Sequence, residues 1–134
     1  MMLTLIDGDR RHAIGAEFDG GVRLDAADVE VALGWKLMPE GLCRGSVCIP
    51  VRDRASLVSG GGLDLEAFAA LLDRPLALDA GERVAALGEN AGSRASALQT
   101  LEAPDFTLPD LTGHLHSLSE HRDKKVLLIA YASW

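Results

Sequence analysis

The two cysteines, Cys43 and Cys48, are the first residues in this sequence with a spacing that could support chemistry. They lie in the segment EGLCRGSVCIPV and are separated by four residues. Such a pair can cycle between dithiol and disulfide and relay electrons to another redox centre, with Arg44 stabilising a thiolate and Gly45 allowing a tight turn. Alternatively, the two face each other across a hairpin, as buried small apolar side chains or as a structural bridge. A metal site would need more than two ligands, and no nearby histidine completes one.

Three of the four histidines, His114, His116 and His121, cluster before the last apolar run, and His12 stands alone. At the spacing His-x-His, two imidazoles can share one face of a strand and bind a transition metal. The segment nevertheless has the pattern of a connection between a hairpin and a helix, where solvated histidines are expected. The sequence therefore predicts no metal and no cofactor.

The composition indicates a globular protein. The chain has 134 residues, 48% of them hydrophobic, with a net charge of −7 and a pI near 4.9. An acidic chain does not attract nucleic acid or an anionic membrane, so neither is expected as a partner. The apolar stretch before Asp7 is too short for a signal peptide or a membrane span, which predicts a cytoplasmic protein. In reducing cytosol, two cysteines stay thiols unless they cycle.

An aspartate begins each of two predicted helices. Asp25 and Asp64 occupy N-cap positions, where a carboxylate accepts hydrogen bonds from the amides of the first turn. Gly34 ends the first helix and Pro75 blocks extension of the second. Apolar residues then recur at helical spacing and line one face of each helix. These residues are Val29, Ala32 and Leu33 in the first helix and Phe68, Leu71 and Leu72 in the second.

The two helices belong to stretches that match at an offset of thirty-nine residues, VRLDAADVEVALGWKL from Val22 and GLDLEAFAALLDRPL from Gly62. This self-similarity suggests an internal repeat. The matched pairs are Leu24/Leu63, Asp25/Asp64, Val29/Phe68, Leu33/Leu72 and Leu37/Leu76.

Short strands are predicted around both helices, at LTLI, HAIGAEF, WKLM, VCIPV, LALD and RVAAL, with turn signals between them. The sequence thus predicts an α+β module built from duplicated helix and hairpin units. In the residues ALGWKL and CIPV it resembles the copper amine oxidase N-terminal-like domains, a name that implies no copper binding here.

The composition changes at GENAGSRASALQTLE, residues 88–102, where small and polar residues replace the periodic apolar pattern. This is typical of a linker, and one helical turn is expected in SRASALQTL. We therefore predict an N-terminal α+β module with an internal repeat at residues 1–90, a linker at 91–102 and a further domain at 103–134.

From Leu101 the chain reads LEAPDFTLPDLTGHLHSLSEHRDKKVLLIAYASW. The run VLLIAYA lacks alternation, as in a parallel strand covered on both faces, and Lys124 and Lys125 mark its solvent edge. This segment, a quarter of the chain, resembles the entry to a thioredoxin-like domain of the alkyl hydroperoxide reductase/thiol-specific antioxidant (redoxin) family, which includes membrane-tethered thiol-disulfide relatives. The resemblance implies a truncated thioredoxin-like α/β domain. Its parts would be an opening at 103–106, a hairpin at 108–113, a first helix from 117–119 and a first central strand at 126–130.

The same resemblance places the attacking residue, the cysteine of Cys-x-x-Cys or a selenocysteine, immediately after Trp134. Tyr131, Ala132, Ser133 and Trp134 would flank it, and no catalytic residue would lie within the chain. In the family a helix N-terminus after the nucleophile lowers the pKa of the thiol. Either the sequence is a fragment, or a UGA codon at position 135 that specifies selenocysteine was read as a stop.

Two functions are consistent with these features. In the first, the chain is the N-terminal part of a thiol or selenol oxidoreductase, a peroxiredoxin-like antioxidant protein whose partners are a thiol reductant and a disulfide or peroxide substrate. The 134-residue chain itself is then expected to be inactive. In the second, the N-terminal module is a non-enzymatic interaction domain and the tail only a domain remnant. In either case an apolar strand without a sheet exposes an unpaired edge, so disorder, docking or self-association through residues 126–132 is expected.

Overall fold

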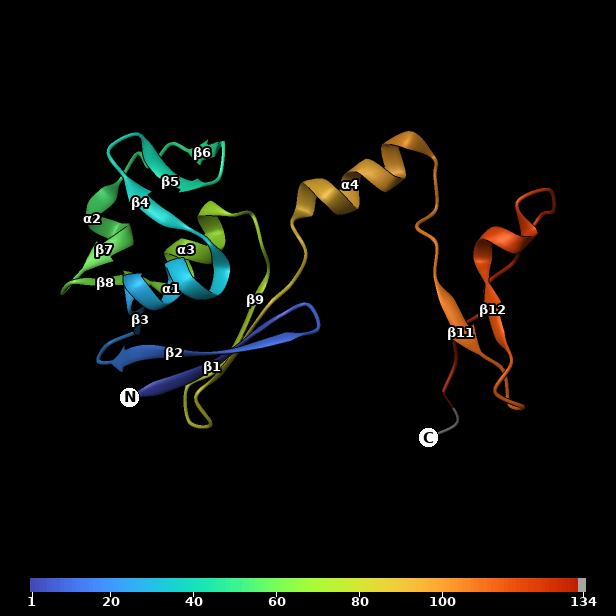
Figure 1. Cartoon of the computed structure of the whole chain (residues 1–134), viewed down its shortest axis with the longest axis horizontal. Coiled ribbons are helices and arrows are strands. Elements are labelled where there is room, and N and C mark those ends of the chain that lie inside the picture. Colours follow the sequence, from blue (N-terminus) through green and yellow to red (C-terminus); the bar gives the residue numbers. More distant parts are fainter. Residues whose placement is uncertain (133–134) are drawn as a thin grey trace. The chain divides into compact units, whose positions relative to one another are not determined.

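A computed structural model describes residues 1–132, except for the side chain of Ala97, and shows an α+β protein. The chain divides into two compact units, Met1–Ala95 and Ser96–Trp134. Figure 1 shows both units and the labels of their helices and strands.

A mixed seven-stranded sheet forms the main layer of the N-terminal unit (Figure 1). Its strand order is β7-β8-β3-β2-β1-β10-β9, and only β1 and β10 pair in parallel. In chain order the strands are β1 (Met2–Asp7), β2 (Arg10–Phe18), β3 (Val22–Leu24), β7 (Val58–Ser59), β8 (Gly62–Asp64), β9 (Leu76–Asp79) and β10 (Val84–Leu87).

Two helices, α1 (Ala26–Leu33) and α3 (Leu65–Leu71), begin at the two predicted caps. The Asp25 carboxylate accepts hydrogen bonds from the amides of Ala27 (2.9 Å) and Asp28 (3.1 Å). Asp64 accepts one from Ala67 at 2.8 Å. Gly34 ends α1 in the left-handed region at φ 75°, which glycine adopts without steric cost. The two predicted helix starts and the end of α1 are therefore confirmed.

A second, three-stranded antiparallel sheet contains β4 (Lys36–Met38), β5 (Gly41–Arg44) and β6 (Val47–Ile49). Each of its two connections is a loop of two residues, because Met38 pairs with Gly41 and Arg44 pairs with Val47. A one-turn helix, α2 (Arg54–Leu57), follows and leads into β7.

The two matching stretches meet at one strand pair. Leu24 of β3 lies opposite Leu63 of β8 in an antiparallel ladder, and each strand leads directly into its helix. The element order is also the same in both: β3-α1-β4-β5 in the first and β8-α3-β9-β10 in the second. Val29 and Phe68, the matched positions on the two helices, are both fully buried. A shared geometry thus accompanies the sequence match.

The apolar core lies between the seven-stranded sheet and the helices. Among the described residues, every buried apolar side chain belongs to the N-terminal unit, and no charged or polar residue is buried. The largest fully buried side chains are Phe68, Leu3, Leu5, Ile14, Leu24, Leu42, Leu57, Leu63, Leu65 and Val29. This unit therefore has the core that an independently folding domain requires.

Residues 91–100, predicted as a linker with one helical turn, form a ten-residue helix, α4 (Ala91–Thr100). The helical turn expected there is thus part of a longer helix. Its first turn is anchored through Asn90, whose side-chain amide donates to the Leu72 carbonyl at 2.7 Å and whose side-chain oxygen accepts from the Ser93 amide at 3.2 Å. This anchoring starts a helix whose small and polar residues carry no apolar stripe.

The C-terminal unit contains a short hairpin and one helical turn. The antiparallel strands β11 (Thr107–Pro109) and β12 (Leu115–Ser117) form the hairpin, and the 3-10 helix η1 (Leu118–His121) follows directly. The hairpin and the helix start expected from the sequence are confirmed. The strand expected at 126–130 is not: residues 126–132 have no regular structure and are exposed. A strand needs a neighbour for its backbone hydrogen bonds, and no described strand pairs with this segment.

Candidate redox site

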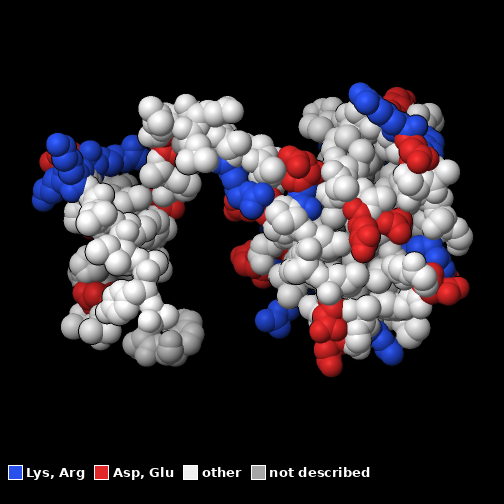
Figure 2. Space-filling view, turned by 180° about the vertical axis from the view of Figure 1, so that it is seen from behind, with Lys and Arg blue, Asp and Glu red and all other residues white. Residues whose placement is uncertain are grey.

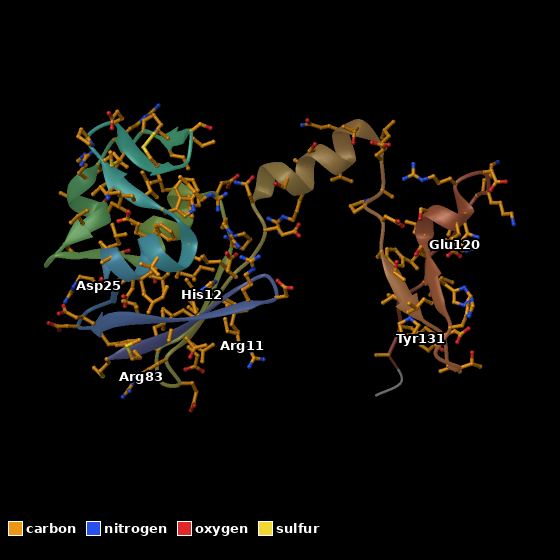
Figure 3. The ribbon with its side chains drawn as sticks, in the orientation of Figure 1. Arg11, His12, Asp25, Arg83, Glu120 and Tyr131 are labelled. Carbon is orange, nitrogen blue, oxygen red and sulfur yellow. A yellow bond between two sulfur atoms is a disulfide. The ribbon has the colours of Figure 1, made fainter. Side chains whose placement is uncertain are left out.

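Cys43 and Cys48 lie directly opposite each other on β5 and β6, and their sulfur atoms form a disulfide (Figure 3). Their Cα atoms are 4.0 Å apart. Of the alternatives left open by the sequence, the structure thus shows a bonded pair across a hairpin. The bridge closes a very short loop, so its effect on the entropy of the unfolded chain is small, about 2 kcal/mol.

The disulfide lies on the outer face of the three-stranded sheet. Leu42 and Ile49, the neighbouring pair in the ladder, pack against the core. Since side chains alternate between the two faces of a strand, the sulfur atoms of the next pair point away from the core. Arg44, one position further along β5, lies on the inner side with its guanidinium 4.7 Å from the ring centre of Trp35. Arg44 is therefore not beside the disulfide, contrary to the role the sequence suggested for it.

Lys36 of β4, rather than Arg44, is the basic residue on the same face of the sheet as the disulfide. It pairs directly with Cys43 across the β4–β5 ladder, so both side chains lie on the same face as neighbours. Its ammonium group also contacts the Glu30 carboxylate at 3.1 Å. Sequence reasoning missed Lys36. The signal was available in the two-residue loop Pro39-Glu40, because a two-residue hairpin loop fixes which residues lie opposite.

The two sulfur-bearing residues differ in exposure. Cys43 is buried, with 9% of its surface accessible, and Cys48 is exposed. The Cys43 sulfur lies 3.8 Å from the Gly41 carbonyl oxygen, which can accept a hydrogen bond from a thiol. One sulfur is thus open to a reagent from solvent and the other is held against the strand.

A cleft of about 510 Å³ lies on the Trp35 side, bordered by Arg44, Ile49 and Arg74. The Arg74 guanidinium is already engaged: it contacts the Asp7 carboxylate at 2.6 Å and the Gly88 and Leu87 carbonyls at 2.6 and 3.1 Å. This arginine closes the module by joining β1 to the end of β10, which leaves the cleft without a free guanidinium from Arg74.

In the C-terminal unit, Asp110 holds the turn between β11 and β12. Its carboxylate accepts hydrogen bonds from the Thr112 hydroxyl at 2.7 Å, the Thr112 amide at 2.8 Å and the His114 amide at 3.0 Å. Its second oxygen lies 2.9 Å from Nε2 of His116. These donors, the Thr112 hydroxyl first and His116 next, hold the pKa of Asp110 well below its ordinary value. The aspartate of the Pro-Asp-Leu-Thr-Gly segment is therefore a structural residue.

This pKa predicts an acid-dependent hairpin. A carboxylate with a lowered pKa stabilises the fold above its unfolded-state pKa of about 3.9. The stabilisation is lost as the pH falls through the folded-state value. We expect the carboxyl carbon resonance of Asp110 to titrate in more acidic solution than that of a free aspartate, with the β11–β12 pairing lost in the same range. In Asp110→Asn the pairing should no longer depend on pH in this range, and a normal Asp110 titration would contradict the assignment.

Asp105 connects the segment before β11 to the 3-10 helix η1. Its carboxylate accepts from the Ser119 amide at 2.8 Å and from the Phe106 amide at 3.1 Å. The side-chain and backbone hydrogen bonds of Ser119 lower the pKa of Asp105. Ser117, the N-cap of η1, makes no side-chain capping bond, so Asp105 supplies the carboxylate that the first turn lacks.

The histidines form no metal site within the described residues. The rings of His114 and His116 lie 5.1 Å apart in a T-shaped contact, and both are exposed, as is His121. Across residues 1–132 no group of three or more His, Cys, Asp or Glu side chains is arranged to hold a metal ion. The same residues contain no helix with the length and apolarity needed to cross a membrane.

The residues predicted to flank a nucleophile lie at the end of the chain. Tyr131 is 89% exposed (Figure 3), and Ala132 is exposed as well. Ser133 and Trp134 lie outside the described residues. Tyr131 and Ala132 belong to the C-terminal unit, whereas the cysteine pair belongs to the N-terminal unit. No protein-family model, curated protein or solved structure matches the chain.

Proposed function

We propose that this chain is the N-terminal part of a thioredoxin-like thiol or selenol oxidoreductase, which reduces peroxides or disulfides through a nucleophile immediately after Trp134. The observation that carries the proposal is the local structure of the redoxin-like residues. They form a hairpin at Thr107–Ser117 and continue into a helical turn at Leu118, in the order that the resemblance implies. Both aspartates of the motif have structural roles there, at the turn and at the helix start.

The exposed apolar side chains of the C-terminal unit support the same proposal. Within the described residues this unit buries no large apolar side chain, and Leu127 is 85% exposed. The face of the C-terminal unit that Figure 2 shows carries mainly uncharged residues. Exposed apolar surface of this kind needs a partner, and the rest of a thioredoxin-like domain would supply one. The other exposed apolar residues of this unit include Leu108, Leu111, Leu115, Val126, Leu128, Ile129 and Tyr131.

The proposed chemistry needs a group that this chain does not contain. A thiolate or selenolate attacks the peroxide or disulfide, and a thiol reductant restores it. Cys43 and Cys48, the only cysteines, are joined to each other in the N-terminal unit. Residues 1–134 alone are therefore expected to reduce neither substrate class through the proposed centre.

The test compares the 134-residue chain with a version extended through the codons that follow Trp134 in the gene, with UGA read as selenocysteine if it is present. Peroxide consumption and insulin disulfide reduction are measured with a dithiol reductant. We expect activity only in the extended protein, and its loss when the residue after Trp134 is replaced by serine. An extended protein with neither cysteine nor selenocysteine at that position, or with activity unaffected by the serine, would refute the proposal.

A second function is favoured by the completeness of the N-terminal unit, which holds all the buried core of the described chain. On this hypothesis residues 1–95 bind a partner and the tail contributes no chemistry. Inactivity of every extended form, together with a defined partner bound at micromolar affinity or better by residues 1–95, would favour it.

Self-association through residues 126–132 is a separate expectation, because these exposed apolar residues are unpaired. Sedimentation of the 134-residue chain should show oligomers. They should disappear in a paired Leu127→Asp/Ile129→Asp variant.

A further inference from the structure

We propose that the Cys43–Cys48 disulfide is a thiol–disulfide exchange site, at which a dithiol reductant attacks Cys48 and Cys43 leaves as a thiolate beside Lys36. The site lies wholly within the N-terminal unit and does not depend on the function proposed for the tail. The outcome of its test is therefore independent of the test of the function proposed for the tail.

The direction of attack follows from exposure. A thiolate attacks a disulfide in line with the S–S bond, from the side of the attacked sulfur that faces away from its partner. Solvent access therefore decides which of the two sulfur atoms is attacked. Cys48 is on the edge strand β6 of the three-stranded sheet and is exposed, whereas Cys43 is on the central strand β5 and is buried. The structure therefore favours Cys48 as the attacked residue.

Lys36 favours Cys43 as the leaving group. The two residues are direct cross-strand neighbours, which places their Cβ atoms about 4.5–5.5 Å apart. A nearby ammonium group stabilises the developing thiolate, and a stabilised thiolate leaves faster. The competing contact of Lys36 with Glu30 joins two half-exposed side chains, and such surface pairs are weak.

The hairpin is held together without the disulfide. Leu42 and Ile49 fix β5 and β6 to the core, and Gly45 makes the connecting turn at φ 58°. In the reduced form the Cys43 thiol has the Gly41 carbonyl oxygen as an acceptor. Both redox forms can therefore keep the same fold, as a reversible exchange site requires.

The reaction conserves atoms and electrons as follows. A reductant thiolate bonds to the Cys48 sulfur, the Cys43–Cys48 bond breaks, and its electron pair stays on Cys43. The second thiolate of the reductant then attacks its own mixed-disulfide sulfur and releases the Cys48 thiolate. The protein gains two electrons and, from solvent, up to two protons, and the dithiol becomes a disulfide. The partner class is thus a small dithiol or a protein with a vicinal dithiol.

Trapping on the unmodified chain tests the direction of attack. The oxidised 134-residue protein is treated with reduced glutathione, quenched with N-ethylmaleimide and mapped by mass spectrometry. We expect glutathione on Cys48 and maleimide on Cys43. In a denatured sample the two sulfur atoms are equally accessible, so glutathione should be found on both Cys43 and Cys48. Glutathione mainly on Cys43, or no adduct in the folded protein where the denatured one reacts, would overturn the proposal.

A matched pair of variants tests the role of Lys36. Lys36→Gln removes the cation on the disulfide face, and Arg44→Gln removes the adjacent cation on the opposite face. At a separation of a few ångströms near the surface we expect reduction by dithiothreitol to slow by about threefold or more in Lys36→Gln. Arg44→Gln should stay within about 1.5-fold of the wild type, because its guanidinium contacts Trp35. Equal rates in all three proteins would remove Lys36 from the mechanism, and circular dichroism confirms that each variant is folded.

Discussion

Replacing Phe68 with alanine should lower the free energy of unfolding of the N-terminal unit by about 3–5 kcal/mol. Phe68 has 0% of its surface exposed and lies in the core with Leu24, Leu63 and Val29. The substitution removes an aromatic ring from a region with no solvent access, so it loses the transfer free energy and leaves a cavity. Small domains are stable by only about 5–15 kcal/mol, so a large share of the total would be lost.

Urea unfolding followed by circular dichroism measures this effect. Val31→Ala is the matched control, because Val31 lies on the neighbouring helix α1 and is 88% exposed. Its effect should stay within about 0.5 kcal/mol. Similar losses in the two variants would show that the burial of Phe68 does not determine its contribution to stability.

Replacing Gly41 with alanine should destabilise the three-stranded sheet by about 2–4 kcal/mol. Gly41 has φ 149°, a region that residues with a Cβ rarely adopt. An added Cβ would lie 2.1 Å from the Ile49 carbonyl oxygen and 2.8 Å from its carbon, both backbone atoms. Because Gly41 and Ile49 belong to paired strands, the strands must separate to admit the methyl group, and the cysteines then lose their register.

Gly45→Ala is the control in the same sheet. Gly45 also has a positive φ, 58°, yet a Cβ there would meet nothing within 4 Å. Only the left-handed backbone cost, about 1–2 kcal/mol, should appear. Urea midpoints and the rate of dithiothreitol reduction should both change more in Gly41→Ala. If Gly45→Ala lowered the urea midpoint more than Gly41→Ala, the close approach of β5 and β6 would not explain the loss of stability in Gly41→Ala.

Features set by local chemistry could be predicted from the sequence. The helix caps Asp25 and Asp64 act within one turn, and Gly34 ends α1 through its own backbone conformation. The strands β1, β2, β4, β6, β9 and β10 follow apolar runs bounded by turn residues, and each was predicted. The strands β3, β5, β7 and β8 were missed. Each is short and contains or adjoins a glycine, so no apolar run marks it in the sequence, and its pairing decides its structure.

The parts that depend on pairing and anchoring could not be predicted in this way. The neighbourhood of Lys36 and Cys43 exists only because of the β4–β5 register. The helix α4 begins where Asn90 is anchored to the Leu72 carbonyl, a contact between distant residues. The apolar run at 126–132 was predicted as a strand from its lack of alternation and from the resemblance to the redoxin family. Composition favours a buried strand but does not provide the neighbour that a strand requires.

The most direct measurement of the central claim is to locate the nucleophile in the protein extended beyond Trp134. The reduced protein is treated with one equivalent of hydrogen peroxide, and the resulting sulfenic or selenenic acid is trapped with dimedone and mapped by mass spectrometry. The proposed function predicts a single dimedone adduct on the residue that follows Trp134. An adduct confined to Cys43 or Cys48, or no adduct on the C-terminal unit, would contradict it.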